Sequence, residues 1–142
     1  MDLANNGKVI REREVFDYVD PVSQESINAA FHGADELPII LYPTQRILLA
    51  SAEVVDIPLG CLGHICLRST FARLGLLSPP TVADPGFKGT LTMEVYNASK
   101  NPILIEPGVA MWSLHYLAVF ERSSSYSGKY QGQTDLTIPK AI

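Results

Sequence analysis

Short apolar runs, each ended by a turn-forming residue, constrain the fold of this chain more than any other feature of its sequence. Runs rich in Ile, Leu and Val recur between ten Pro and ten Gly residues. Such runs suit β-strands, because β-branched side chains fit a pleated, half-buried surface and Pro or Gly interrupts it. The expected strands are 37–42, 46–54, 62–68, 89–96, 102–105 and 109–120.

Helical periodicity is weak throughout the sequence. The best helical candidate is a short turn at 69–76, where Ser69 is placed to cap the first turn and Gly75 to end the last one. A series of short strands with frequent turns predicts an all-β sandwich or barrel.

The sequence predicts a single domain over residues 1–142. It contains no internal repeat and no linker, and its 142 residues suffice for one core. We expect a polar start at 1–13 and a C-terminal tail at 123–142, which is rich in Ser, Gly and polar residues at its beginning. Such a tail is expected to be mobile, either without a role or as a lid that closes on a ligand.

The charge of the chain limits its partners. Eleven Lys and Arg against 15 Asp and Glu give a net charge of −4. A surface of this sign repels polyanions, so we expect no nucleic-acid partner. No apolar run approaches the roughly 20 residues that cross a bilayer, and no secretory segment opens the chain, so we expect a cytoplasmic protein with no membrane partner.

The cysteine and histidine residues do not predict a zinc site. Cys61, His64 and Cys66 lie on one expected strand, where alternation puts His64 on the face opposite Cys61. This spacing is poor for a tetrahedral site. We therefore expect these three residues to lie in the core or at an interface, without a disulfide.

Two polar segments follow or interrupt the expected strands. Arg68–Arg73 places two guanidinium groups and two hydroxyls directly after a strand, and such groups suit phosphate oxygens. The alternative is a solvated turn with a capping Ser. Asp84 opens a Pro/Gly turn that ends at Gly89, where an acid either binds a ligand or caps its own backbone.

Two further segments carry groups suited to chemistry. By alternation Glu94 shares one face of its strand with Thr92 and Tyr96, where a carboxylate either lines a pocket and transfers protons or is simply exposed. Residues 129–133 combine a cation, an aromatic ring and two amides around a Gly. They could fold over a nucleotide or belong to a disordered tail.

The order of these segments resembles that of the dCTP deaminases, close relatives of the trimeric dUTPases. The motifs are RSTFARLGL, ADPGFKG, MEVYN, EPG and KYQGQ, and the resemblance covers residues 46–133. It implies a dUTPase-like distorted β-barrel of the jelly-roll type, the β-clip. It also implies a homotrimer with sites between neighbouring subunits.

The resemblance implies hydrolytic deamination of dCTP to dUTP, continuing to dUMP in bifunctional relatives. Glu94 matches the catalytic carboxylate, and Ser69 and Arg73 match residues that activate the water and stabilise charge on the base. The substrate-binding residues implied are Arg68 and Thr70 for the triphosphate, Asp84 and Phe87 for the deoxyribose, and Lys129, Tyr130 and Gln133 of the tail. The metal implied is Mg²⁺ carried by the triphosphate, without zinc.

Of three departures from the family pattern, the one at Trp112-Ser113 implies little, and the other two bear on function. The N-terminal S-x-D-x-R-L-G type motif has no counterpart, and the stretch 74–83, which reads the base in the family, is shorter and contains Pro79 and Pro80. Adjacent prolines restrict the backbone and remove donors. Preference for cytosine or uracil therefore stays open. The alternatives are a dUTP pyrophosphatase and a non-catalytic nucleotide-binding paralogue that acts as a sensor or sponge.

Overall fold

The computed structural model describes residues 3–10, 31–36, 38–119 and 124–140. Within this part it contains twelve strands and one short helix, which confirms the all-β prediction. The elements are β1 (Leu3–Ile10), β2 (Phe31–Glu36), β3 (Ile39–Leu41), β4 (Arg46–Ser51), β5 (Val55–Asp56), β6 (Cys61–Leu67), α2 (Ser69–Arg73), β7 (Leu76–Leu77), β8 (Thr81–Ala83), β9 (Lys88–Gly89), β10 (Thr92–Asn97), β11 (Ile103–Ile105) and β12 (Trp112–Ala118).

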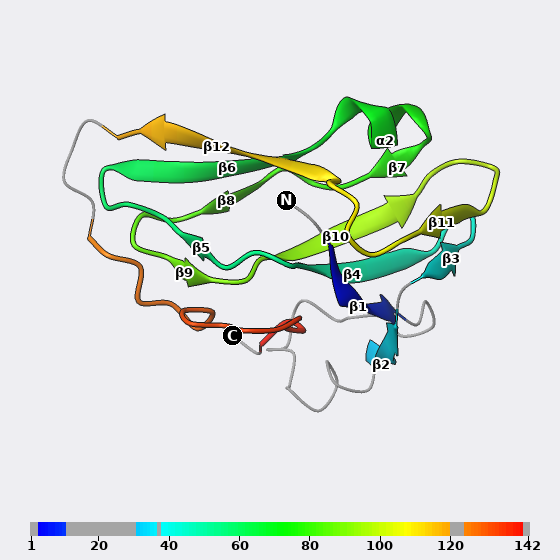
Figure 1. Ribbon diagram of the computed structural model, residues 1–142, viewed down its shortest axis with the longest axis horizontal. Helices are drawn as coiled ribbons and strands as arrows, with labels where there is room; N and C mark the ends of the chain where they lie inside the picture. Colours follow the sequence, from blue (N-terminus) through cyan, green and yellow to red (C-terminus); the bar gives the residue numbers. More distant parts are fainter. Residues whose placement is uncertain (1–2, 11–30, 37, 120–123, 141–142) are drawn as a thin grey trace, which may run out of the picture.

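All strand pairings are antiparallel, and two main sheets stack on each other. One sheet has the order β2-β1-β4-β10-β7 and the other β12-β6-β8, while β11–β3 and β5–β9 form separate pairs. In Figure 1 β12, β6 and β8 lie above β10 and β4. A sheet buries its apolar face by packing against another layer, so the stacking of the two sheets encloses the core.

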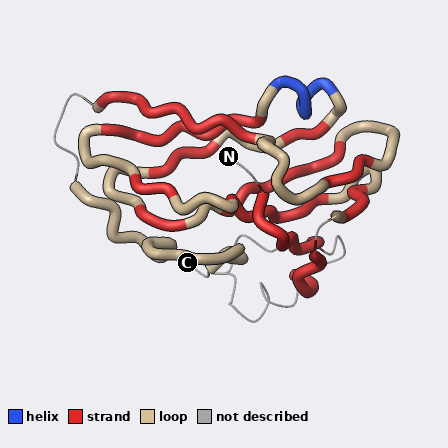
Figure 2. Tube along the Cα trace, viewed as in Figure 1, coloured by secondary structure: helices blue, strands red, loops and turns tan. Residues whose placement is uncertain are grey.

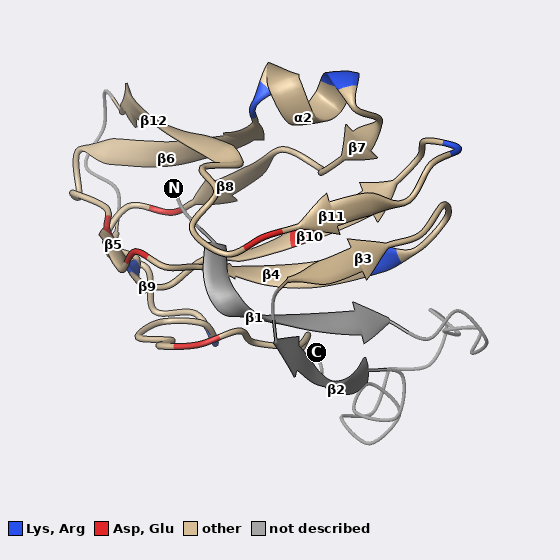
Figure 3. Cartoon of the chain, turned by 45° about the vertical axis from the view of Figure 1, so that its right-hand side comes forward, with Lys and Arg blue, Asp and Glu red and all other residues tan. Residues whose placement is uncertain are grey.

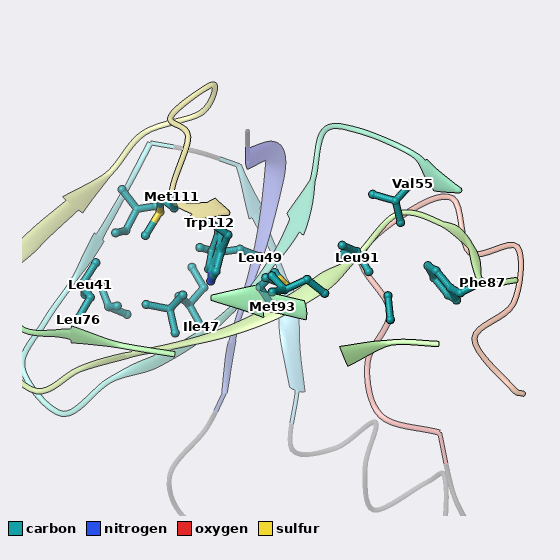
Figure 4. Close-up of a cluster of buried hydrophobic side chains, with 14 of the residues drawn as sticks. Leu41, Ile47, Leu49, Val55, Leu76, Phe87, Leu91, Met93, Met111 and Trp112 are labelled. Atoms are coloured by element: carbon teal, nitrogen blue, oxygen red, sulfur yellow. The ribbon is translucent and has the colours of Figure 1, made fainter. Parts of the chain in front are cut away.

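The core runs along the length of the domain. In Figure 4 Phe87, Val55 and Leu91 lie at one end, and Leu41 and Leu76 lie at the other. The middle is filled by Leu49, Met93 and Trp112. The buried cluster consists of Leu41, Ile47, Leu49, Val55, Ile57, Ile65, Leu76, Ala83, Phe87, Leu91, Met93, Val95, Ile105, Met111 and Trp112.

The central strands follow the predicted hydrophobic pattern. Every residue of β4 after Arg46 is buried, as expected for a continuous apolar run covered on both faces. In β10, Met93 and Val95 are buried while Glu94 between them is exposed. The alternation predicted for this strand is therefore confirmed, and it directs Glu94 away from the core.

The helical turn is shorter than predicted, and its cap is different. The helix ends at Arg73, and the residue in the N-cap position is Arg68, with no side-chain cap. The prediction that Ser69 caps this turn is therefore wrong. Gly75 follows the helix with φ of +96°, a left-handed conformation that Gly adopts without strain, so its predicted role is confirmed.

Several strands are absent from the sequence prediction. Strand β1 lies within the expected polar start and contains Asn-Asn-Gly rather than an apolar pattern, yet it pairs with β4 through partners such as Lys8 and Leu48. The strands β5, β7 and β9 have two residues each. Their backbone pairing depends on distant partners, so no local pattern reveals them. Among the residues that the structure describes, no helix has the length and apolar character needed to cross a membrane.

A buried asparagine joins the end of β10 to two turns. Asn97 is fully buried, and its Nδ2 donates to the Leu41 and Asn101 carbonyl oxygens at 2.8 and 2.9 Å. Its Oδ1 accepts from the N–H of Ser99 at 2.9 Å and from the Ser99 hydroxyl at 2.7 Å. All the hydrogen-bonding capacity of this amide is used. The neighbouring Gly75 fits only because it has no side chain, since a Cβ there would lie 2.6 Å from the Cβ of Ser99.

We predict that Asn97→Asp lowers the free energy of unfolding by about 3 kcal/mol, because a buried carboxylate would face two carbonyl oxygens. Urea denaturation measures this change. The matched control is Asn101→Asp, the same substitution at an exposed position, and it should change stability by less than about 0.5 kcal/mol. Equal stabilities of the two variants would contradict the prediction.

Candidate functional site

Helix α2 presents polar side chains to the exterior. Arg68, Ser69, Thr70 and Arg73 are all exposed. Arg68 is the N-cap residue of α2 and Arg73 its last residue, and Figure 3 shows positively charged residues at this helix. Within the described part of the chain, no hydrogen bond engages the side chains of Ser69, Thr70 or Arg73. These guanidinium and hydroxyl groups are therefore available to an anionic ligand.

The start of α2 is fixed by the segment before β12. The N–H of Arg68 donates to the Met111 carbonyl oxygen at 2.9 Å, and Arg68 Nη1 donates to the Ala110 carbonyl oxygen at 3.0 Å. Phe71 packs against the core from the other side of the helix. One guanidinium nitrogen of Arg68 thus holds the backbone, and the rest of the group faces outward.

The turn that follows β8 exposes an acid above a buried ring. Asp84 is exposed, whereas Phe87 is only 6 % exposed and meets Tyr126 edge to face with 5.7 Å between ring centroids. The turn is closed by a backbone bond from Phe87 N–H to the Asp84 carbonyl oxygen at 3.0 Å. Among the described residues no partner engages the Asp84 carboxylate. It does not cap its own turn, so it is available to a ligand.

Glu94 lies at the middle of the outer face of β10. It is exposed, stands opposite Leu48 of β4, and is flanked by the half-buried Thr92 and Tyr96. The sequence left open whether the Glu94 carboxylate lines a pocket or is exposed. In a single chain it is exposed. For Glu94 to lie in a covered site, a ligand or another chain must pack over this face of β10.

The described tail, residues 124–140, packs against β9 and the start of β10. Thr90 N–H donates to the Gln133 carbonyl oxygen at 2.9 Å, and Thr137 N–H donates to Thr92 Oγ1 at 3.1 Å. In Figure 1 this segment, coloured orange to red, runs below β9. Gly89 permits the contact, since a Cβ on it would lie 2.8 Å from the Gln133 carbonyl oxygen.

The three tail residues implied in substrate binding make contacts within the chain. Lys129 Nζ donates to the Lys140 carbonyl oxygen at 2.7 Å and lies 5.6 Å from the centre of the Tyr130 ring. Tyr130 Oη accepts from the N–H of Lys140 at 3.2 Å. Gln133 Nε2 donates to the Thr90 carbonyl oxygen, while its Oε1 is buried without a partner among the described residues.

Apart from Glu94 on β10, the expected site residues form two separate groups in one chain. The α2 group is Arg68, Ser69, Thr70 and Arg73, and the tail group is Asp84, Phe87, Lys129, Tyr130 and Gln133. Figure 2 places the helix and the tail on opposite sides of the molecule, and the rotated view in Figure 3 agrees. A single chain therefore does not bring all these side chains around one ligand.

Sequence reasoning missed contacts that shape the site. Trp112 Nε1 donates to Ser78 Oγ at 3.1 Å and so anchors the Pro79–Pro80 stretch to β12. The side chain of Gln131 contacts backbone atoms of Gly86 and Lys88. Gln131 lies within the motif KYQGQ, which is the one signal that could have identified it, but no sequence pattern reveals that its partners are main-chain atoms.

Both cysteines and two of the three histidines, His64 and His115, lie on the sheet β12-β6-β8. Cys66 Sγ lies 3.3 Å from His64 Nδ1, and the His64 and His115 rings are 6.5 Å apart. Cys61 and Cys66 are half-buried free thiols. Within the described residues, no group of three or more His, Cys, Asp and Glu residues is placed to hold a metal ion.

A model of the dCTP deaminase-like family matches residues 1–119. The dCTP deaminase of Pyrobaculum arsenaticum is 39 % identical over 124 residues, which are 87 % of this chain and 70 % of that protein. The dCTP deaminase of Sulfurisphaera tokodaii is 36 % identical over 146 aligned residues, covering 99 % of this chain and 75 % of that protein.

Two solved structures share the fold. The 2′-deoxycytidine 5′-triphosphate deaminase from Agrobacterium tumefaciens has a TM-score of 0.64 at 15 % identity over 81 % of this chain, which spans only 36 % of that longer chain. The EIAV dUTPase has a TM-score of 0.54 at 20 % identity over 70 % of this chain and 85 % of its own. These likenesses confirm the predicted dUTPase-like β-clip fold.

We predict that Gly89→Ala detaches the tail from β9, because the added Cβ would overlap the Gln133 carbonyl oxygen and φ at this position is +155°. Hydrogen exchange of the Thr90 amide, which donates to that oxygen, should accelerate at least about tenfold. The matched control is Gly60→Ala, where a Cβ meets open space. If Thr90 exchanges equally slowly in both variants, the tail does not depend on Gly89.

Proposed function

The chain belongs to the dCTP deaminase-like family, and on that premise we propose that it hydrolyses dCTP to dUTP and ammonia. The observation that carries the proposal is the exposure of Ser69 and Arg73 on α2 together with Glu94 on β10, with no internal partner for these side chains among the described residues. Polar groups of this kind, kept free of internal hydrogen bonds, are available to a substrate.

In the proposed reaction, Glu94 takes a proton from a water molecule, and the oxygen of that water attacks C4 of the cytosine. The carboxyl group then passes that proton to N3 of the ring. It next takes the proton of the new C4 hydroxyl and delivers it to the amino group, so that C4=O forms as the C4–N bond breaks and ammonia leaves. One carboxyl group can act as base and then as acid in this way. Arg73 stabilises the charge that develops on the base, and Ser69 orients the water. Zinc has no part in this proposal.

The remaining residues bind the nucleotide. Arg68 and Thr70 contact the triphosphate, which carries Mg²⁺ as part of the substrate. The Asp84 carboxylate accepts a hydrogen bond from the 3′-hydroxyl, and Phe87 lies beside the sugar. The free carboxylate of Asp84 supports this role, since no described residue competes for it.

The tail residues complete the proposed phosphate site. Lys129, Tyr130 and Gln133 reach the phosphates once their present contacts with Lys140 and Thr90 are exchanged for contacts with the ligand. Lysine acts on a phosphate as a compact positive charge, so Lys129 is suited to this exchange.

We also propose a homotrimer in which each site is shared by two copies. The separation of α2 from the β9–tail region supports it, because a second chain can bring its α2 over the face of β10 that carries Glu94. Such a contact would cover the carboxylate and exclude bulk water, which strengthens electrostatic interactions in a site. A cytoplasmic location agrees with the two free thiols.

The direct test is incubation with dCTP and Mg²⁺, followed by anion-exchange separation of nucleotides and an ammonia assay. We predict dUTP and ammonia, with kcat at least about a hundredfold lower for Glu94→Gln, which removes the proton shuttle. The matched control is Glu53→Gln at another exposed position, which should retain kcat. Full activity of Glu94→Gln would overturn the mechanism.

The alternative functions predict other products. Formation of dUMP from dCTP with ammonia would add the hydrolytic step of the bifunctional relatives. Pyrophosphate and dUMP from dUTP, without ammonia from dCTP, would assign the chain to dUTP hydrolysis instead. Tight nucleotide binding without any product would assign it to the sensor or sponge class.

Shared sites make a further prediction. Arg73→Ala and Glu94→Gln should each be inactive alone, whereas a co-refolded equal mixture should recover up to about a quarter of wild-type activity, because random assembly gives that share of sites an intact residue from each chain. Activity is compared before and after subunit mixing. An inactive mixture that has exchanged subunits would show that Arg73 and Glu94 act from the same chain.

A further inference from the structure

The turn at residues 85–88 has seven backbone hydrogen-bonding groups, because Pro85 has no N–H. The domain itself satisfies three of them. Gly86 N–H donates to the Ile57 carbonyl oxygen at 2.8 Å, the Phe87 carbonyl oxygen accepts from Ile57 N–H at 2.9 Å, and Phe87 N–H donates to the Asp84 carbonyl oxygen at 3.0 Å. Buried or half-buried backbone groups need such partners, so these bonds fix one side of the turn.

The tail satisfies the other four groups. The Pro85 carbonyl oxygen accepts from Tyr126 N–H at 2.9 Å, and the Lys88 carbonyl oxygen accepts from Gly132 N–H at 2.8 Å. The last two groups are served by the side chain of Gln131. More than half of the backbone bonding of this turn therefore depends on a segment that lies about 40 residues further along the chain.

The amide of Gln131 spans the turn with both ends used. Its Oε1 accepts from Lys88 N–H at 2.9 Å, and its Nε2 donates to the Gly86 carbonyl oxygen at 2.9 Å. The orientation of the amide follows from its partners, since an N–H requires the oxygen and a carbonyl requires the nitrogen. A carboxylate in this place could serve Lys88 but would repel the Gly86 oxygen.

The side chains next to the turn show the same dependence on the tail. Phe87 packs edge to face on Tyr126. Gly86 lies so close to the tail that a Cβ would be 2.4 Å from Ser125 Oγ and 3.1 Å from Ser125 Cα. The turn and the tail are thus fitted to each other in both hydrogen bonding and packing.

We propose that Gln131 is a positioning residue through which the docked tail sets the conformation of the turn that presents Asp84 and Phe87. The identity of the ligand in this proposal rests on the proposed function. Gln131 does not touch the substrate but holds the backbone from which the Asp84 carboxylate projects. The tail then acts on the sugar-binding end of the site as well as on the phosphates.

Tail docking and recognition of the 3′-hydroxyl are consequently coupled. If the docked tail favours the turn that binds the nucleotide, the nucleotide must favour the docked tail by the same factor. A change at Gln131 should therefore weaken both tail docking and nucleotide binding. The loss of binding should be largest for ligands that contact Asp84.

The first experiment measures tail docking without any nucleotide. Trypsin cleaves after Lys129 when the tail opens, and the rate follows the open fraction when opening is fast. Gln131→Glu should accelerate this cleavage about tenfold, since it loses the bond to Gly86 and adds repulsion. The matched control is Thr134→Ala, at an exposed tail position, and it should cleave at the wild-type rate.

A second variant should also favour the open tail, through backbone strain instead of a lost hydrogen bond. Gly132 has φ of +74° and open space where a Cβ would be, so Gly132→Ala disfavours only the docked backbone conformation. It should also accelerate cleavage after Lys129. Unchanged cleavage in both variants would overturn the proposal.

The second experiment separates positioning of the turn from general loss of the tail. Calorimetry in a Glu94→Gln background measures binding of dCTP and of 2′,3′-dideoxy-CTP with Mg²⁺. Gln131→Glu should raise the Kd for dCTP by about tenfold and the Kd for the dideoxynucleotide by clearly less, because that ligand lacks the group that Asp84 binds. Equal losses for the two nucleotides would overturn the role of Gln131 at the turn.

The two proposals fail in different ways. Absence of ammonia from dCTP, with the expected cleavage and binding pattern, would reject deamination and leave the role of Gln131 intact. Deamination with wild-type cleavage and binding in Gln131→Glu would reject the role of Gln131 and leave the reaction intact.

Discussion

The antiparallel pairing of β10 with β4 is the interaction on which the other features depend. Its register sets Met93 opposite Leu49 and Glu94 opposite Leu48. A shift by one residue would exchange the two faces, burying Glu94 and exposing Met93. The burial of Met93 and Val95 on the other face of β10 therefore fixes the outward direction of the proposed catalytic carboxylate. At its C-terminal end, β10 is held by the hydrogen bond from Asn97 to the Leu41 carbonyl oxygen. The neighbouring Ser99 packs against Gly75, the residue that follows α2 by two positions.

The two ends of the domain are stabilised in different ways. Near α2, the buried Asn97 amide and the Arg68 guanidinium bind backbone carbonyl groups of Leu41, Asn101 and Ala110, which lie in β3 and in the loops before β11 and β12. Near β9, the backbone is held by the tail, which follows β12. The tail forms hydrogen bonds with residues 85–88, Thr90 and Thr92, more than 35 positions earlier in the chain. A surface segment without strand pairing, such as residues 124–140, opens more readily than a core strand. The sugar-binding end of the proposed site is thus the end that depends on a detachable element.

The sequence predicts the parts of this fold that have a local signal. The alternation of residues 91–96, the continuous apolar run of β4 and the Gly75 helix end were all readable, because burial leaves a period of two and a left-handed backbone favours Gly. Strand β9 has only two residues, and β1 lacks an apolar pattern. Their pairing is set by distant backbone partners, which no local composition encodes. For the same reason the sequence identified Glu94 and Asp84 as candidates but not Gln131, whose partners are main-chain atoms.

The free carboxylate of Asp84 follows from this distribution of backbone partners. An Asp at the start of a turn usually accepts a hydrogen bond from the N–H two residues later, which here belongs to Gly86. That N–H donates instead to the Ile57 carbonyl oxygen, and Gln131 serves the N–H of Lys88. Because these donors are already satisfied, the turn does not need the Asp84 side chain for its own stability. Contacts from Ile57, which follows β5, and from the tail thus take the place of a structural role for the carboxylate, and this leaves Asp84 available to a ligand.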